Sequence, residues 1–148
     1  MTSDDTFAAS LRKVGLKTTE SRLSVLRVLS RLRTPLRIKD LHIRLKKSKS
    51  KIDMVTVYRT VETLTEKNMV RRVDFGEGAA YYEWNNGEDS HHMSCLDCKK
   101  RETVKNCFFS EFEARVMSKV PAFKQITRHS IEYFGLCKKC APKQSKKK

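Results

Sequence analysis

The stretch that decides the fold lies at positions 89–98 and reads Asp-Ser-His-His-Met-Ser-Cys-Leu-Asp-Cys. It combines three kinds of metal-binding side chain, namely carboxylate, imidazole and thiol. A second Cys-x-x-Cys pair follows at Cys137 and Cys140. Two such pairs supply four thiolates, which is enough to close a tetrahedral zinc site. We therefore expect one structural zinc ion to be bound by Cys95, Cys98, Cys137 and Cys140.

The main alternative for a Cys-x-x-Cys motif is a thioredoxin-like redox pair. A redox motif needs one such pair, whereas this chain has two. A closed site of four thiolates leaves no open coordination position, so the zinc is expected to stabilise the fold and not to catalyse. The fifth cysteine, Cys107, lies outside both pairs, and such a residue is more often a small buried hydrophobe than a thiol sensor.

Strand alternation separates the two histidines that precede Cys95. If this segment is extended, Asp89 and His91 point to one face, while Ser90 and His92 point to the other. The first face then offers a carboxylate and an imidazole to a second metal ion. The second face has only His92, because a serine stands where another ligand could have been.

The charge of the chain points to a polyanion as its partner. The 148 residues include 32 Lys and Arg against 17 Asp and Glu, a formal net charge of +15. Residues 12–59 alone hold 15 Lys and Arg against three acidic residues, and counterion release from phosphates dominates affinity for nucleic acids. A solvated basic surface is the alternative, and it is less common at this density of charge.

The sequence gives no sign of a membrane or export segment. No apolar run approaches the roughly 20 residues that span a bilayer. The N-terminus also lacks the basic-then-apolar pattern of a signal peptide. We therefore expect a cytoplasmic protein, in which cysteines stay reduced and bind metal more readily than they form disulfides.

The first half of the chain predicts four helices followed by a hairpin, because apolar residues recur at helical spacing between capping and breaking residues. The expected helices cover residues 4–14, the segment from a cap at Thr18 or Thr19 to before Pro35, the segment from Ile38 to the polar run at 48–51, and the segment from a cap at Asp53 to Asn68. Strand-forming residues then run from Met69 to Phe75 and from Tyr81 to Trp84, on either side of a Gly-Glu-Gly turn.

Helices followed by a two-stranded hairpin are typical of a winged-helix domain. In that architecture the last helix before the hairpin enters the major groove of DNA, which here means the segment from Asp53 to Lys67. Its outward candidates are Thr56, Tyr58, Arg59 and Thr63. The alternative is a small α+β domain without a role in DNA binding, and the basic charge of residues 12–59 disfavours it.

The second half predicts a smaller mixed domain. The sequence Asn85-Asn86-Gly87 is a turn signal and the best candidate for a hinge between the halves. Beyond it we expect an extended segment at 89–94, a helix over 109–120 and a strand over 124–134. His129 lies on that last strand, where a histidine is more often satisfied by hydrogen bonds in the core than bound to metal. The Lys-rich tail at 142–148 is expected to be disordered.

In their order along the chain, these motifs resemble those of the ferric uptake regulator family of metal-dependent bacterial repressors. The matching motifs are Thr56-Val57-Tyr58-Arg59, the His-x-x-Cys-x-x-Cys at 92–98, His129-Ser130, Tyr133-Phe134-Gly135 and the Cys-x-x-Cys at 137–140. The resemblance implies an α+β chain with an N-terminal winged-helix DNA-binding domain and a small α/β dimerisation domain that holds a zinc site of four cysteines. The corresponding ranges are 1–84 for the DNA-binding domain, 85–87 for the hinge, 88–141 for the metal-binding dimerisation domain and 142–148 for a basic tail.

The resemblance also implies a homodimer whose metal state controls binding to a palindromic operator in double-stranded DNA. Tyr58 and Arg59 match the family's recognition-helix contacts, and Thr56 precedes them in the same motif. Lys17 matches a basic residue that approaches the minor groove. A dimer presents two such helices to a palindromic site.

The family's metal site within the dimerisation domain maps onto four residues that can all bind metal. They are Asp89, His91, Glu113 and His129. A set of two nitrogen and two oxygen ligands suits Zn²⁺, Fe²⁺ or Mn²⁺ and selects poorly among them. The resemblance therefore favours a role as metal ligand for His129, in place of the core role considered above.

The family's other regulatory site, between the two domains, carries over incompletely. Glu83 matches its acidic ligand and His92 matches one histidine. Ser90 replaces a second histidine, and the loop at 33–36 contains no histidine at all. We therefore expect regulation to depend on the Asp89/His91 site, with Glu83 and His92 forming an incomplete third site.

Several alternatives stand beside a metal-responsive repressor of metal homeostasis genes. A peroxide-responsive regulator of the same family is disfavoured by Glu83, where those members typically have Asp, and a zinc-uptake regulator by the lack of a cysteine at 84–94. A regulator that binds DNA without an added metal is a third. A zinc hydrolase needs a metal-bound water and leaves the recognition-helix motif unexplained. An RNA-binding zinc module needs exposed aromatic residues on a sheet, and charge alone does not reject it.

Overall fold

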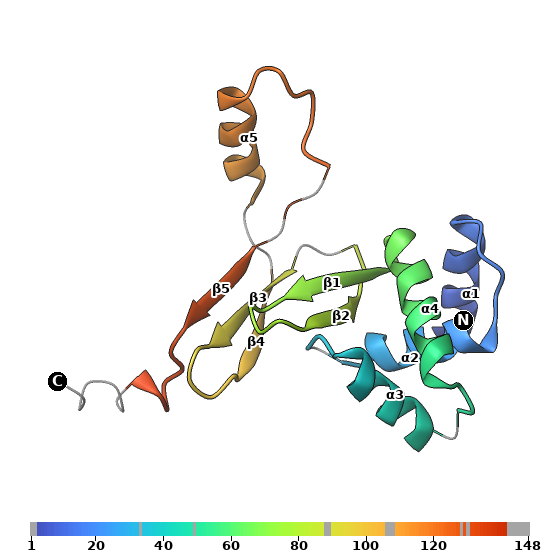
Figure 1. The fold of residues 1–148 in the computed structure, drawn as a ribbon. Coiled ribbons are helices and arrows are strands. Elements are labelled where there is room, and N and C mark those ends of the chain that lie inside the picture. The colour runs from blue at the N-terminus through green and yellow to red at the C-terminus, as the bar shows by residue number, and fades with distance from the viewer. Residues whose placement is uncertain are drawn as a thin grey trace. The chain divides into compact units, whose positions relative to one another are not determined.

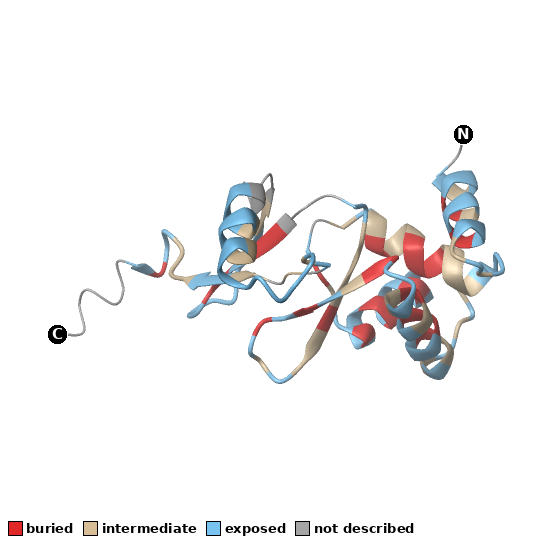
Figure 2. Cartoon of the chain, turned by 90° about the horizontal axis from the view of Figure 1, so that it is seen from above, coloured by how far each residue is buried: buried red, intermediate tan, exposed pale blue. Residues whose placement is uncertain are grey.

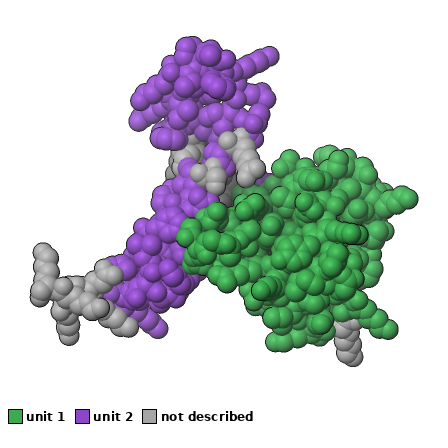
Figure 3. All heavy atoms as spheres, in the orientation of Figure 1, with its two compact units in different colours: residues 1–86 green, residues 87–148 purple. Residues whose placement is uncertain are grey.

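The computed structural model describes residues 3–32, 34–48, 50–87, 90–105, 109–127, 129 and 131–141. Asp89, Cys107 and the tail at 142–148, for which the sequence makes predictions, lie outside these residues. The chain divides into two compact units, residues 1–86 and residues 87–148 (Figure 3). Within the described ranges, every helix is too short or too polar to cross a bilayer.

The first unit contains the four predicted helices and the predicted hairpin (Figure 1). The helices are α1 (Ser3–Lys13), α2 (Glu20–Ser30), α3 (Ile38–Lys47) and α4 (Met54–Glu66), and the antiparallel strands are β1 (Val70–Asp74) and β2 (Ala80–Trp84). Two helix starts have predicted caps, which are Asp53 for α4 and, of the two threonines considered for α2, Thr19. The Thr19 side chain accepts a hydrogen bond from the N–H of Arg22 at 3.4 Å, and Asp53 accepts one from the N–H of Thr56 at 2.9 Å.

The four helices pack one apolar face each into a common core, and Figure 2 shows the buried residues along them in red. The fully buried side chains are Leu11, Val25, Leu26, Leu41, Leu45, Val57, Val61, Leu64 and Val70. Burial of one side chain of this size contributes about 1.5–3 kcal/mol. The first unit therefore has a hydrophobic core of its own.

A backbone bridge that the sequence did not predict joins the hairpin to the helices. Leu36, in the loop before α3, pairs with Tyr82 through two N–H···O hydrogen bonds of 2.9 and 2.7 Å. Beyond this bridge, Val73, Phe75 and Tyr81 form a second small apolar cluster. Helices that support a two-stranded wing confirm the predicted winged-helix fold.

The second unit is built around β3 (Ser90–Cys95), the central strand of a three-stranded sheet in the order β4-β3-β5. It pairs antiparallel with β4 (Arg101–Lys105) and parallel with β5 (Glu132–Gly135), and α5 (Phe109–Lys119) follows β4 in the chain. The extended segment and the helix are as predicted. The predicted strand over 124–134 is largely wrong, because the described residues before Glu132 in this segment are not in a strand, and β4 was not predicted.

Candidate metal centre and nucleic-acid interface

The four cysteines come together at the ends of two neighbouring strands. Cys95 is the last residue of β3 and lies opposite Gly135 of β5 in parallel register. The turn after β3, which holds Cys98, and the turn after β5, which holds Cys137 and Cys140, therefore lie at the same end of the sheet. All four sulfur atoms lie within 4.8 Å of one another.

Backbone N–H groups stabilise the charged form of one thiol in this cluster. The N–H of Cys137 donates to the sulfur of Cys95 at 3.3 Å, and with the N–H of Cys98 it lowers the pKa of Cys95 to about 6. The pKa of Cys140 is instead raised, first by a hydrogen bond to Asp97 and then by burial. Metal ligation requires thiolates, so a cation bound at this cluster displaces the remaining thiol protons.

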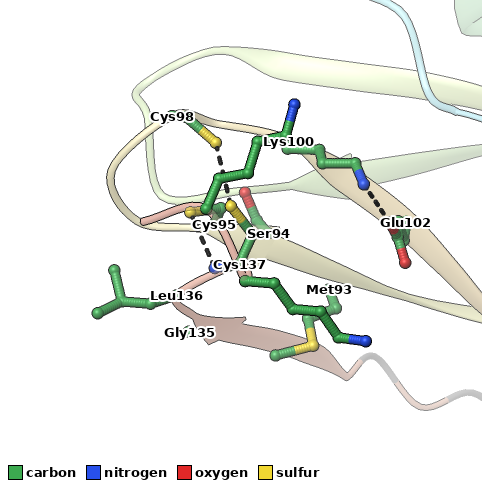
Figure 4. A pocket seen from close by; sticks show the side chains of 11 residues that line it. Met93, Ser94, Cys95, Cys98, Lys100, Glu102, Gly135, Leu136 and Cys137 are labelled. Carbon is green, nitrogen blue, oxygen red and sulfur yellow. Dashed lines mark hydrogen bonds and ion pairs between the residues drawn. The ribbon is translucent and has the colours of Figure 1, made fainter. Parts of the chain in front are cut away.

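The geometry of the cluster fits a zinc ion. In a tetrahedral site with Zn–S distances of about 2.3 Å, neighbouring sulfur atoms lie about 3.8 Å apart. The sulfur atoms of Cys98 and Cys137 are 3.7 Å apart, as the dashed line in Figure 4 marks. Cys95 and Cys140 are buried, whereas Cys98 is exposed beside a hollow of about 740 Å³. The cluster therefore has the spacing and the ligand chemistry of a structural zinc site.

Three of the four residues predicted for the second metal site lie in the described part of the chain, and they approach one another. Nδ1 of His129 is 2.9 Å from a carboxylate oxygen of Glu113. The rings of His91 and His129 have their centroids 5.2 Å apart. Among the described residues, only the four cysteines form a group of three or more side chains in position to hold a metal ion. His91, Glu113 and His129 therefore lie near one another, and Asp89, the fourth predicted ligand, lies outside the described residues.

The two residues predicted for the incomplete third site belong to different units. Glu83, on β2, lies opposite Arg71 of β1 and accepts a hydrogen bond from its guanidinium at 2.7 Å. His92 is buried in β3, in register with Thr103 on β4 and Glu132 on β5. An arginine therefore already supplies the positive charge beside the carboxylate of Glu83.

The predicted DNA-contacting residues of α4 differ in exposure. Tyr58 is 49% exposed, and Arg59 beside it is exposed as well. Thr56 is half-buried, and its hydroxyl donates to the carboxylate of Asp53 at 2.8 Å, so its proton is used by the helix cap. Val55 is 59% exposed and shares the outward face, although sequence reasoning passed over it. Its spacing of three residues from Tyr58 is the signal that could have identified it.

The fourth predicted DNA contact, Lys17, lies in the loop between α1 and α2 and is exposed. Its backbone carbonyl accepts a hydrogen bond from the guanidinium of Arg22 at 2.6 Å. This bond links the loop to the first turn of α2. The backbone from which the Lys17 side chain extends is therefore held at its carbonyl. The residue is therefore positioned by the same helix whose N-cap is Thr19.

Several carboxylates of the first unit are engaged by arginines. The guanidinium of Arg27 contacts Asp4 at 2.7 Å and Glu20 at 2.8 Å, and it lowers the pKa of both carboxyl groups. Arg37 likewise contacts Glu77 at 3.2 Å. Residues 1–86 hold 18 lysines and arginines against ten acidic residues, and several of these acids are paired, so the unit has an excess of positive charge.

The fold and the site together define a metal-binding winged-helix protein. Residues 13–134 match the model of the ferric uptake regulator family. The chain belongs to this family, and the resemblance inferred from its motifs is confirmed.

Individual relatives are similar over almost the whole chain. The ferric uptake regulation protein of Campylobacter jejuni is 31% identical over 144 residues, which cover 96% of this chain and 90% of that protein. The peroxide-responsive repressor of Staphylococcus aureus is 25% identical over 135 residues, covering 91% and 89%. The crystal structure of the Vibrio cholerae ferric uptake regulator aligns with a TM-score of 0.71 at 26% identity, covering 88% of this chain and 98% of that one.

Proposed function

We propose that this protein is a metal-responsive transcriptional repressor that binds a palindromic operator in double-stranded DNA as a homodimer and controls genes of metal homeostasis. The observation that carries the proposal is the family match over residues 13–134, which includes α4 and the first Cys-x-x-Cys pair. A regulator of this kind acts by binding and not by catalysis. It works in the cytoplasm, where its DNA target lies and cysteines stay reduced.

The first unit is the proposed DNA-binding domain, with α4 as its recognition helix. Tyr58 and Arg59 stand on the outward face of α4, where side chains of a recognition helix contact base edges. Thr56 supports the same turn, and Lys17 lies in an exposed loop from which it can approach the minor groove. The positive surface of this unit adds the sequence-independent attraction to phosphates.

The second unit is the proposed dimerisation domain. It exposes large apolar side chains that a monomer would leave in water, namely Phe112, Phe123, Tyr133 and Phe134. Apolar surface of this kind marks protein–protein contacts, and a second copy of this chain is the proposed partner. Two copies related by a twofold axis present two α4 helices to the two halves of a palindrome.

The metal dependence is assigned to two sites. The four-cysteine cluster holds structural Zn²⁺, and the set of Asp89, His91, Glu113 and His129 holds the regulatory ion, which its ligand types allow to be Zn²⁺, Fe²⁺ or Mn²⁺. Of these four regulatory ligands, the described residues His91, Glu113 and His129 come from β3, α5 and the segment before β5. An ion that binds them together favours the one arrangement of these segments in which they meet, and so shifts the population toward it.

The test is DNA binding with and without the regulatory metal. An operator is selected from a random duplex library, and its affinity is measured after mild chelation that leaves the structural zinc in place, then after addition of Zn²⁺, Mn²⁺ or Fe²⁺. We expect affinity to fall on chelation and to return with the effector ion. Unchanged binding after chelation would reject the metal switch and favour a regulator that binds DNA without added metal.

A peroxide-responsive regulator is the second candidate, because the Staphylococcus aureus relative has that name. In such regulators an iron-ligating histidine is oxidised. Glu83, where those members typically have Asp, argues against it. Treatment of the Fe²⁺-loaded protein with hydrogen peroxide separates the two, because a peroxide sensor gains oxygen on a histidine, by mass spectrometry, and loses DNA binding.

A further inference from the structure

The outward face of α4 carries an apolar stripe that the core does not use. Val55 is 59% exposed and Tyr58 is 49% exposed. Residues three apart are neighbours on a helix surface, and Arg59 follows at the next position on the same face. One exposed valine needs no explanation in a soluble protein. Two exposed apolar side chains in consecutive turns beside an arginine form a surface suited to a ligand with both apolar and polar groups.

The first turn of α4 holds Val55 in a fixed position. The carboxylate of Asp53 accepts two hydrogen bonds from Thr56, one from the backbone N–H at 2.9 Å and one from the hydroxyl at 2.8 Å. Val55 lies between these two residues in the chain. A β-branched side chain in a helix has essentially one χ1 rotamer, so its isopropyl group is presented in one orientation.

The chemistry of Val55 restricts what it can recognise. It has no hydrogen-bonding group, and the apolar group that a base pair shows in the major groove is the C5-methyl of thymine. The N-terminal residues of a recognition helix are those that contact base edges. We propose that Val55 reads the methyl group of a thymine in each half of the operator, one turn before the position of Arg59. The inference rests on the proposed function, because it requires α4 to enter the major groove.

Replacement of thymine by deoxyuridine tests this directly, because it removes the methyl and leaves base pairing unchanged. Each thymine of the selected operator is replaced in turn, symmetrically in both half-sites, and affinity is measured with the metal-loaded protein. For wild type we expect one position at which the replacement weakens binding about fourfold per half-site, the worth of one buried methyl. In Val55→Ala we expect thymine and deoxyuridine at that position to bind equally.

The control is Ile43→Ala, which removes another exposed apolar side chain of the same unit, on α3, 53% exposed. It should keep the wild-type ratio between thymine and deoxyuridine. Folding of Val55→Ala is not in question, since alanine has the higher helix propensity and the site is exposed; circular dichroism verifies it.

The outcomes separate the inference from the function on which it rests. If wild type binds its operator but no thymine is sensitive to deoxyuridine, or if Val55→Ala keeps the full ratio, the inference is overturned and the proposed function stands. If the wild-type protein selects no duplex at all, the proposed function fails and the inference fails with it. Loss of the ratio in Tyr58→Ala but not in Val55→Ala would assign the contact to the tyrosine ring and reject the valine.

Discussion

Two neighbouring residues of β3, His91 and His92, have different surroundings despite their shared chemistry. His91 is buried with its ring beside that of His129, which in turn contacts Glu113. His92 is equally buried but stands in register with Thr103 and Glu132. Alternation along a strand sends adjacent side chains to opposite faces. The first histidine therefore belongs to a set with other ligand types, and the second is proposed for the incomplete site.

Single replacements of these histidines should change the metal content differently. In His91→Ala we expect about one metal ion fewer per chain than in wild type, because one ligand of the second site is gone. His92→Ala should lose little, since its site lacks two of the family's ligands. Elemental analysis of the purified proteins measures both, and each variant is the other's control. Loss of an ion in His92→Ala with full content in His91→Ala would reverse the site assignment.

At the scale of the element, α4 shows how one helix serves two surfaces. Val57, Val61 and Leu64 are buried in the core, while Val55 and Tyr58 face outward. The buried face fixes the helix against α2 and α3, and the cap at its start fixes the orientation of its first turn. Side chains on the outward face can therefore be replaced without unfolding the domain.

The same substitution at two positions of α4 tests this division. Val57→Ala removes two buried methyl groups and leaves a cavity, so we expect a loss of about 2 kcal/mol in the free energy of unfolding. Val55→Ala, only two residues away, should change it little, because that side chain is 59% exposed. Urea denaturation followed by circular dichroism gives both values. Equal destabilisation would mean that the two faces are not separate.

Local signals explain which elements could be predicted. The helices of the first unit have apolar residues at helical spacing, and Thr19 and Asp53 cap helices where the sequence indicates. β4 could not be found in this way, because three of its five residues are charged and only its pairing with β3 makes it a strand. The strand observed in the predicted segment 124–134 is also determined by pairing. It is shorter than predicted, because among the described residues β5 pairs with residues 92–95 of β3.

The candidate sites likewise contain some features that local spacing predicts and others that depend on how the chain packs. The spacing within each Cys-x-x-Cys pair is local, so the sequence indicated a metal. The two pairs meet because β3 pairs in parallel with β5. The sequence does not show this strand pairing, and it suggested a shared site only because a zinc ion needs four thiolates and each pair supplies two. The exposure of Val55 and the pairing of Glu83 with Arg71 depend on how the chain packs, and neither follows from a motif.

At the scale of the whole molecule, the two units are stabilised differently. The first has an extensive apolar core. In the described part of the second, the buried apolar side chains are Cys95 and Cys140, and the buried polar ones are His91, His92 and Ser94. A unit of about this size is marginal by itself, and we therefore expect bound zinc and association with a second copy to stabilise it.

Removal of zinc should therefore unfold one unit and spare the other. After strong chelation we expect backbone amides in residues 87–148 to lose protection from hydrogen exchange, while those of α2 and α4 keep it, measured by mass spectrometry. Cys98→Ser should give the same pattern without a chelator, whereas Cys107→Ser should resemble wild type. Simultaneous loss of protection in both units would contradict the independence of their cores.

The position of the second Cys-x-x-Cys pair also determines the order in which the protein matures during synthesis. The first unit leaves the ribosome with all its core residues and can fold at once. The zinc site cannot close until Cys140 has been made, later than almost all of the described chain. A nascent protein in a zinc-starved cell would thus have a folded first unit and an open second one. Availability of zinc would then limit how much of the newly made protein survives proteolysis.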